Sequence, residues 1–458
     1  MNERSGAEVL RTGRDTPPAP VREVRAGPLT ALLVDGDLRS VRLGGVELVQ
    51  RIYLAVRDLD WNTLPGEITD VSVTDHGTSF DIGYTRRHRG AGIDYLWRAT
   101  ITGSAGGTIS YQMHGEALTG FRYAKIGICV HHPVAGYAGQ PLSGVTPDGP
   151  VSGHLPDTIG PQVHLDDGTD LPLIEPVSEL ELSHRSGGVV RFDFTGDLWE
   201  MEDQRNWTDA SYKSASTPAR LGYQHQAHAG QLFSQQIVVS ARDFTSPAPA
   251  STSTASTAVA STSAAPPVLE IGGPAGLVMP PIGLGCTDPA AELSPRGLAA
   301  LRAVAPAHLR VDLAAGSPDL ERALGAAASL ATRLGCAIEL AVFTRPGGDS
   351  GGLGRLREAL LRLQADLARV LAFSPDEESS FPGTVAAVAA AVRGAAGLAD
   401  VPVIAGTNIY FNELNRHRLP PGQAAGLAWS VNPQIHAFDD LSLMENLQAQ
   451  PDTAATAR

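Results

Sequence analysis

The stretch LRVDLAAGSPDLERALGAAASLATRLGCAIELAVF, residues 309–343, contains two short apolar runs on either side of a longer stretch rich in Ala and Leu. The runs 309–313 and 337–343 have the length of buried strands, and residues 318–334 have the length of a helix. Two strands joined by a crossover helix form a parallel pair. This stretch therefore predicts a parallel α/β unit.

The same alternation continues on both sides of this unit. Further strands are predicted at 282–286, 369–373, 401–406 and 427–431, and further helices at 295–304, 353–367, 384–395 and 441–450. The regular spacing, without a GxGxxG or Walker-type phosphate motif, favours a (β/α)8 TIM-like barrel over a doubly wound nucleotide fold. Six strands are found where such a barrel needs eight. We therefore expect an incomplete barrel, and a chain that is a fragment or a truncated product.

The first half of the chain predicts a different architecture. Short alternating runs are separated by Gly, Asp and Asn turns, at 31–34, 40–43, 52–56, 80–84, 95–101, 108–114, 123–131, 189–194 and 231–240. Many such runs with little helical periodicity predict an all-β sandwich-like domain of two antiparallel sheets. Residues 245–267, almost entirely Ser, Thr, Ala and Pro, read as a linker. We thus expect a multidomain protein with a β domain at 22–244 and the partial barrel at 268–458.

Composition excludes several classes of partner. The net charge of −14, without a basic run, argues against nucleic acid. No apolar run reaches the roughly 20 residues that span a bilayer, and residues 1–21 lack the apolar core of a signal peptide. The three cysteines are far apart, which fits reduced thiols in a cytoplasmic protein. The oligomeric state stays open, and a homo-oligomer is compatible with the sequence.

Polar residues follow the predicted barrel strands, at the strand ends where such barrels carry function. Carboxylates and amides suit a polyhydroxylated ligand, and paired carboxylates can activate water. Glu377 or Glu413 is the candidate general base and His436 the candidate acid. The candidate substrate contacts of this half are Asp312, Asn408, Asn412, Asn432 and Gln434. The alternative is that several of these residues only cap the following helices.

A second dense polar segment is WEMEDQRNWTDASYK, residues 199–213. It has too few apolar positions for an ordinary buried strand, and two tryptophans are unusual in a solvated loop. Lysine occurs only twice in the chain, at Lys125 and at the end of this segment. We expect a carbohydrate-binding cleft, with a structural polar network as the alternative. Its candidate substrate contacts are Glu202, Arg205, Trp207 and Lys213.

Metal and nucleophile motifs are weak. His131 and His132 are adjacent on a predicted strand and should face opposite sides, so they do not form a zinc pair. Ser350 lies in a formal GxSxG match, GDSGG at 348–352, but this is a Gly-rich loop rather than a sharp turn after a strand. No metal and no cofactor are expected.

Four segments together resemble the D-apionate lactonase family: FRYAKIGICVHHPVAGYAG, DLWEMEDQRNWTDASYK, GTNIYFNELNRHR and SVNPQIHAFDDLSLMENLQAQ. The resemblance implies a β domain, a TIM-like barrel and a small C-terminal domain. It also implies hydrolysis of the small-molecule substrate D-apionolactone to D-apionate. In that reaction a carboxylate would take a proton from water, and Arg205 and Lys213 would hold the anionic product. Two alternatives remain: a glycoside hydrolase with barrel carboxylates, and a carbohydrate-binding protein without catalysis.

Overall fold

The computed structural model describes residues 19–166, 169–244, 276–345 and 351–458, together with residues 6, 9, 13, 272 and 273. The chain forms two compact units. The first, called the β unit, contains Met1–Ala250 and Asn432–Thr456, with Arg458. The second, called the barrel unit, contains Ser251–Val431, with Ala457. This division differs from the expected one because Asn432–Thr456 belongs to the β unit. The predicted linker and the loop around Ser350 lie mostly outside the described residues.

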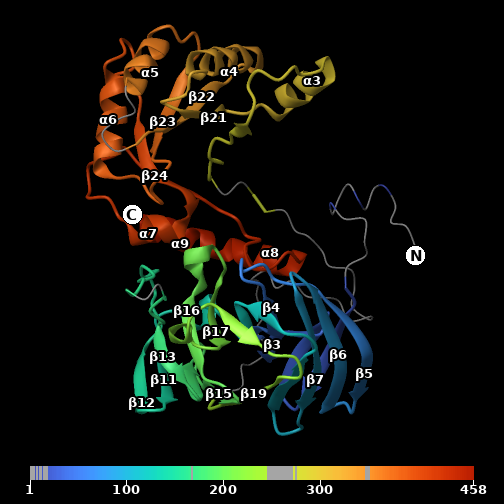
Figure 1. Ribbon diagram of the computed structural model, residues 1–458. Helices are drawn as coiled ribbons and strands as arrows, with labels where there is room; N and C mark the ends of the chain where they lie inside the picture. The colour runs from blue at the N-terminus through green and yellow to red at the C-terminus, as the bar shows by residue number, and fades with distance from the viewer. Residues whose placement is uncertain are drawn as a thin grey trace. The chain divides into compact units, whose positions relative to one another are not determined.

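The β unit is built around two large antiparallel sheets (Figure 1). Sheet A has the order β1-β2-β3-β4-β10-β17-β16-β13. Its strands are β1 (Val21–Ala26), β2 (Leu29–Val34), β3 (Asp37–Leu43), β4 (Val46–Arg57), β10 (Lys125–Pro133), β13 (Ile174–Val177), β16 (Trp199–Asp203) and β17 (Ser211–Ser216).

Sheet B has the order β12-β11-β14-β15-β19-β8-β7-β6-β5. Its strands are β5 (Gly66–Asp75), β6 (Phe80–Gly90), β7 (Ile93–Gly103), β8 (Thr108–Ala117), β11 (Pro141–Thr146), β12 (Gly149–His154), β14 (Glu179–Ser183), β15 (Val189–Thr195) and β19 (Leu232–Arg242). Strands β9 (Phe121–Tyr123) and β18 (His225–Ala227) form a separate pair. The remaining short elements are α2 (Val134–Tyr137), η1 (Gln204–Trp207) and η2 (Ala219–Leu221).

One apolar core joins the two sheets, as the predicted sandwich requires. It includes Leu38 and Ile52 from sheet A and Trp97 and Tyr111 from sheet B, all at most 1% exposed. The nine predicted runs all fall on or overlap strands. A separate expectation, that 199–213 is unlike a buried strand, was wrong. This segment contains β16 and β17, both inside sheet A.

The barrel unit has six parallel strands in sequential order, confirming the predicted incomplete barrel (Figure 1). The strands are β20 (Leu284–Cys286), β21 (His308–Ala314), β22 (Ala337–Phe343), β23 (Leu367–Phe373), β24 (Val403–Tyr410) and β25 (Leu427–Ser430). The helices are α3 (Pro295–Val304), α4 (Leu320–Leu334), α5 (Gly352–Leu361), α6 (Pro382–Arg393) and α7 (Phe411–Arg416). Helix α7 was not predicted.

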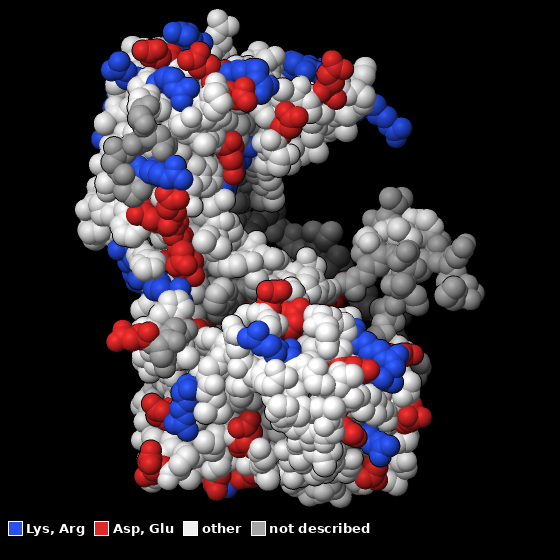
Figure 2. Space-filling view, in the orientation of Figure 1, with Lys and Arg blue, Asp and Glu red and all other residues white. Residues whose placement is uncertain are grey.

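The C-terminal segment of the β unit carries α8 (Asp440–Asn446) and η3 (Leu447–Ala449), followed by α9 (Gln450–Ala457). None of the helices in the described part of the chain combines the length and the hydropathy of a membrane-spanning segment. On the face shown in Figure 2, acidic and basic side chains are interspersed over each unit.

Candidate functional site

In the barrel unit, Glu413 lies in α7, directly after β24, where the carboxyl end of a parallel strand meets a helix. Its side chain is 10% exposed. Arg416, one helical turn later, donates from Nη1 to both carboxylate oxygens, at 3.0 and 2.8 Å. Asn412 donates from Nδ2 to Oε1 at 3.3 Å. The carboxylate is therefore held by two neighbours from its own helix.

The protonation of Glu413 is strongly perturbed. Burial and a hydrogen bond with Glu378 raise its pKa to about 7, although the positive charge of Arg416 lowers it. Burial disfavours the charged carboxylate, and a second carboxyl nearby does the same. A carboxyl group that titrates near neutral pH is suited to general acid–base catalysis.

A cation could also use this cluster. Ligand atoms of Glu378, Glu413 and His417 lie within 4.8 Å of one another. The guanidinium of Arg416 already occupies both oxygens of Glu413. A divalent ion would have to compete with that positive charge, so the donor set fits a metal poorly.

A second contact of the barrel unit spans the hollow of its curled sheet. Arg310 on β21 donates to Asp312 at 2.9 Å and to Asn408 on β24 at 2.5 Å. Two strands separate β21 from β24 in the sheet order, so the side chains meet across the inside of the curve. Two further candidates of this unit carry buried oxygens without a partner among the described residues: Oδ1 of Asn412 and Oε2 of Glu377.

In the β unit, a polar row crosses the face of sheet A that points away from the core. Strand register places one residue from each of five strands side by side, namely Arg39, Arg51, His131, Lys213 and Glu202. The neighbouring His132 points into the core and bonds Ser214 Oγ at 2.8 Å. The two histidines thus face opposite sides, as predicted.

The two residues at one end of this row, Lys213 and Glu202, carry opposite charges and pair with each other. Lys213 Nζ forms an ion pair with the carboxylate of Glu202. Burial alone would raise the pKa of Glu202, but Lys213, with smaller contributions from His436 and Lys125, lowers it to about 2. Glu202 is therefore ionised at neutral pH, and His436 lies close enough to affect it.

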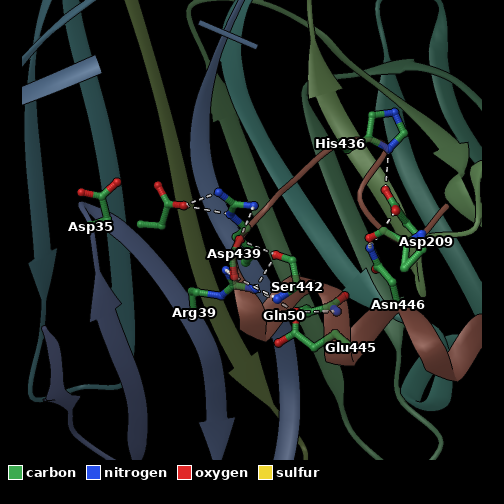
Figure 3. A network of polar contacts seen from close by, with 12 residues as sticks. Asp35, Arg39, Gln50, Asp209, His436, Asp439, Ser442, Glu445 and Asn446 are labelled. Atoms are coloured by element: carbon green, nitrogen blue, oxygen red, sulfur yellow. Dashed lines mark hydrogen bonds and ion pairs between the residues drawn. The ribbon is translucent and has the colours of Figure 1, made fainter. Parts of the chain in front are cut away.

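The segment Asn432–Thr456 packs on the β unit through a polar network (Figure 3). His436 Nδ1 lies 2.5 Å from Oδ2 of Asp209, and Asn446 donates to Oδ1 of the same carboxylate at 2.9 Å. Thr208 Oγ1 donates to the carbonyl of Asn432 at 2.7 Å. The segment is thereby fixed to the loop between η1 and β17.

Arg39 fixes helix α8 to the sheet. Its guanidinium donates to Asp439 at 2.8 Å, Ser442 at 2.9 Å and Glu445 at 2.8 Å. Gln50 on β4 adds a hydrogen bond to Glu445 at 3.0 Å. Because the Arg39 side chain is only 3% exposed, these bonds replace its lost hydration.

Two family models match this chain. The model of the D-apionate lactonase N-terminal domain matches residues 9–244, and that of the D-apionate lactonase TIM barrel domain matches residues 282–458. The chain belongs to the D-apionate lactonase family. The D-apionate lactonase of Brucella anthropi is 29% identical over 469 residues, covering 97% of this chain and 71% of that protein.

Solved structures resemble this D-apionate lactonase family member only distantly. A galactose mutarotase related enzyme from Lactobacillus acidophilus has a TM-score of 0.31 and 10% identity, covering 49% of this chain and 98% of that one. A β-arabinopyranosidase has a TM-score of 0.33 and 10% identity, covering 84% of this chain and 66% of that one. At such TM-scores the likeness indicates nothing about function.

The predicted site residues of this family member fall into separate groups. Glu413 and Asn412 meet in α7, and Asp312 and Asn408 share Arg310. In the β unit, Glu202 and Lys213 pair, and the ring of Trp207 lies 6.5 Å from that of His436. Asn432 and Gln434 lie in the segment of His436, where Asn432 Oδ1 accepts from the Gln434 backbone at 3.0 Å.

Arg205 has a different environment from the other predicted contacts of its segment. It is fully buried and bonds Asp203 at 2.7 and 2.9 Å, the carbonyl of Pro156 at 2.9 Å and Asp452 at 3.0 Å. Asp203 alternates with Glu202 along β16, so Arg205 is bonded on the opposite side of the sheet from Lys213. These contacts are those of the structural polar network that we named as the alternative.

Asp209, Arg51 and the place of His131 in the row were not predicted from the sequence. The alternation of His131 with His132 indicated that one histidine faces outward, but not what surrounds it. No local pattern marks Asp209, because its partner His436 is 227 residues away.

Proposed function

We propose that this chain hydrolyses a sugar-acid lactone, and that its substrate is D-apionolactone, which yields D-apionate. Membership of the family over both units supports the reaction class. The name of the Brucella anthropi relative, D-apionate lactonase, supports the substrate. The observation in this chain that most directly supports this reaction is the carboxyl group of Glu413, whose pKa is about 7.

The reaction needs a base for water and a donor for the ring oxygen. Glu413 takes a proton from water as the water oxygen attacks the lactone carbonyl carbon. The ring C–O bond then breaks, and the proton held by Glu413 goes to the departing oxygen, which becomes a hydroxyl group. A group whose pKa lies near the working pH can both take up a proton and release it. Asp312, Asn408 and Asn412 offer oxygens and amides for the substrate hydroxyls.

The other two catalytic candidates have less support. Glu377 has a buried Oε2 without a partner among the described residues, whereas Glu413 has a hydrogen bond with a second carboxyl group, that of Glu378. His436 is fixed by Asp209 in the β unit, and we assign it no step in this reaction.

Glycoside hydrolysis is the second candidate function, because Glu378 and Glu413 form a close carboxyl pair. Glycosidases that retain configuration use carboxyl groups about 5–5.5 Å apart. We favour the lactonase because the family models describe lactonase domains over both units.

A substrate panel separates the two functions. The purified protein is assayed with D-apionolactone, D-ribono-1,4-lactone and D-glucono-1,5-lactone by acid release, and with nitrophenyl glycosides by nitrophenol release. We expect acid release, fastest from D-apionolactone, and no nitrophenol. Nitrophenol release without lactone hydrolysis would overturn the proposal.

A further inference from the structure

Lys125 is one of the two lysines of the chain, and the proposed reaction does not use it. It is the first residue of β10 and is partly exposed. Its side chain points away from the core, because Ile126 and Ile128 belong to the core and side chains alternate along a strand. His131 lies six residues further along β10, about 20 Å away. Lys125 therefore lies well outside the polar row on which Asn432–Thr456 packs.

The ammonium group of Lys125 has no carboxylate partner. No ion pair and no hydrogen bond joins its Nζ atom to another residue in the described part of the chain. The other lysine, Lys213, is paired with Glu202. The residue directly opposite Lys125 on β4 is a second cation, Arg57, which donates from Nη1 to the carbonyl of Trp61 at 3.1 Å. The partly buried charge of Lys125 is therefore not compensated by a neighbour.

The surroundings of Lys125 favour the neutral amine. Burial lowers the pKa of Lys125, and the positive charge of Lys213 lowers it further. Cys129, Glu200 and Glu202 act in the opposite direction but do not reverse the shift. A lysine with a lowered pKa has a larger neutral fraction at a given pH, and the neutral amine is the nucleophile.

Aromatic residues border Lys125 on the side away from the polar row. The Trp61 ring is 40% exposed, stands edge-on to Tyr223 at 5.3 Å, and lies 6.0 Å from the guanidinium of Arg57. His225 is the remaining titratable neighbour. Burial lowers the pKa of His225 and Lys125 lowers it further, so this ring is neutral at neutral pH. Lys125 thus lies next to an aromatic surface that solvent reaches.

From these contacts we infer that Lys125 is a nucleophilic lysine that sugar lactones acylate. The neutral Nζ amine attacks the lactone carbonyl carbon, and the ring C–O bond breaks. The proton that the amine loses goes to the released ring oxygen. The products are an amide on Lys125 and a new hydroxyl group, and no atom is left over. The choice of a lactone as the acyl donor rests on the proposed function, but the reaction at Lys125 needs no group of the barrel unit.

The test uses D-glucono-1,5-lactone as the probe and peptide mass spectrometry as the measurement. D-Gluconate, which has the same hydroxyl groups but no ester, is the control and should give no adduct. Because the chain has two lysines, the paired Lys213 is the internal comparison. We expect the gluconoyl adduct to form about tenfold or more faster at Lys125 than at Lys213. Equal rates, or no adduct at Lys125, would overturn the inference.

Two further measurements show whether the folded environment causes the difference. In protein unfolded with urea, the two lysines should react at similar rates. In folded protein, trace labelling with acetic anhydride should give Lys125 a rate that rises with pH around a midpoint below 10.5, the ordinary pKa of a lysine. A midpoint at 10.5 would contradict a perturbed amine. Labelling by acetic anhydride but not by the lactone would overturn the lactone as donor.

Charge variants move the rate in opposite directions. Glu200→Gln removes a negative charge that favours the ammonium form, and should speed acylation of Lys125 about twofold or more. Lys213→Gln removes a positive charge and should slow it by a similar factor. Glu67→Gln, at an exposed position on β5, is the control and should change nothing. Equal rates in all three variants would contradict the inference.

A catalytic variant separates this inference from the proposed function. Lys125 in Glu413→Gln should be acylated at least as fast as in the unmodified protein, because that variant consumes less lactone. An adduct at Lys125 that requires Glu413 would contradict the inference. Failure of the proposed catalysis and failure of acylation at Lys125 therefore give different results.

Discussion

Nδ1 of His436 lies 2.5 Å from Oδ2 of Asp209, although 227 residues separate them in the chain. The carboxylate is 4% exposed and also accepts a hydrogen bond from Asn446. Asp209 therefore does two things: it fixes the tautomer of His436, with the proton on Nδ1, and it holds the segment Asn432–Thr456 on the β unit.

Asp209→Asn should destabilise the β unit. The amide presents one N–H₂ group where the carboxylate presents two acceptors, so it cannot accept from both His436 and Asn446. We expect a loss of about 1–3 kcal/mol in the free energy of unfolding, measured by urea denaturation. Asp60→Asn, at an exposed loop position, is the control. Equal stabilities of the two variants would contradict the role of Asp209.

Arg39→Met should release helix α8. The substitution leaves Asp439 and Glu445 without their shared cation, at a cost of about 3 kcal/mol. Hydrogen exchange should rise in Asp440–Asn446 more than in the strands of sheet B. Arg98→Met, at an exposed position on β7, should change neither quantity. Unaltered exchange of α8 in Arg39→Met would show that other contacts hold the helix.

The ion pair of Glu202 and Lys213 predicts an acid dependence of stability. The folded pKa of Glu202, about 2, lies below its ordinary value of 4.5. Its contribution is therefore complete above about pH 4.5 and is lost as the pH falls towards 2. Unfolding experiments between pH 5 and 3 should show a smaller loss of stability in Glu202→Gln than in the unmodified protein. Parallel curves would mean that the pair contributes nothing.

Metal removal should leave lactone hydrolysis intact. Arg416 occupies the carboxylate of Glu413, and a cation at Glu378 and His417 would have to displace it. We expect the same initial rate before and after EDTA treatment and dialysis. A rate that is lost with EDTA and restored by Mn²⁺ or Zn²⁺ would contradict the metal-free mechanism.

The barrel strands could be predicted because their local pattern is strong. Strands buried on both faces appear as continuous apolar runs, and the predicted run at 337–343 matches β22 residue for residue. Strands β16 and β17 escaped prediction because one face of each carries polar side chains. There Glu200, Glu202 and Lys213 alternate with core residues such as Trp199 and Met201, and the charges hide the period of two.

The candidate sites were less predictable than the strands. The sequence pointed to Glu413, because it follows a strand of a parallel sheet, and to the pair of Glu202 and Lys213, because of the dense polar segment. It gave no indication that His436 packs on the β unit, since this depends on contacts with Asp209 that no local pattern records.

Replacing Glu413 by Gln tests the central claim most directly. The amide keeps the shape and the contact with Asn412 but cannot take a proton from water. With D-apionolactone, kcat/KM of the unmodified protein should rise with pH around a midpoint of about 7, as Glu413 loses its proton. Glu413→Gln should lower kcat/KM about a hundredfold and abolish that midpoint, whereas Glu358→Gln, on the exposed side of α5, should change neither. An unchanged rate and pH profile in folded Glu413→Gln would contradict the assignment of Glu413 as the general base.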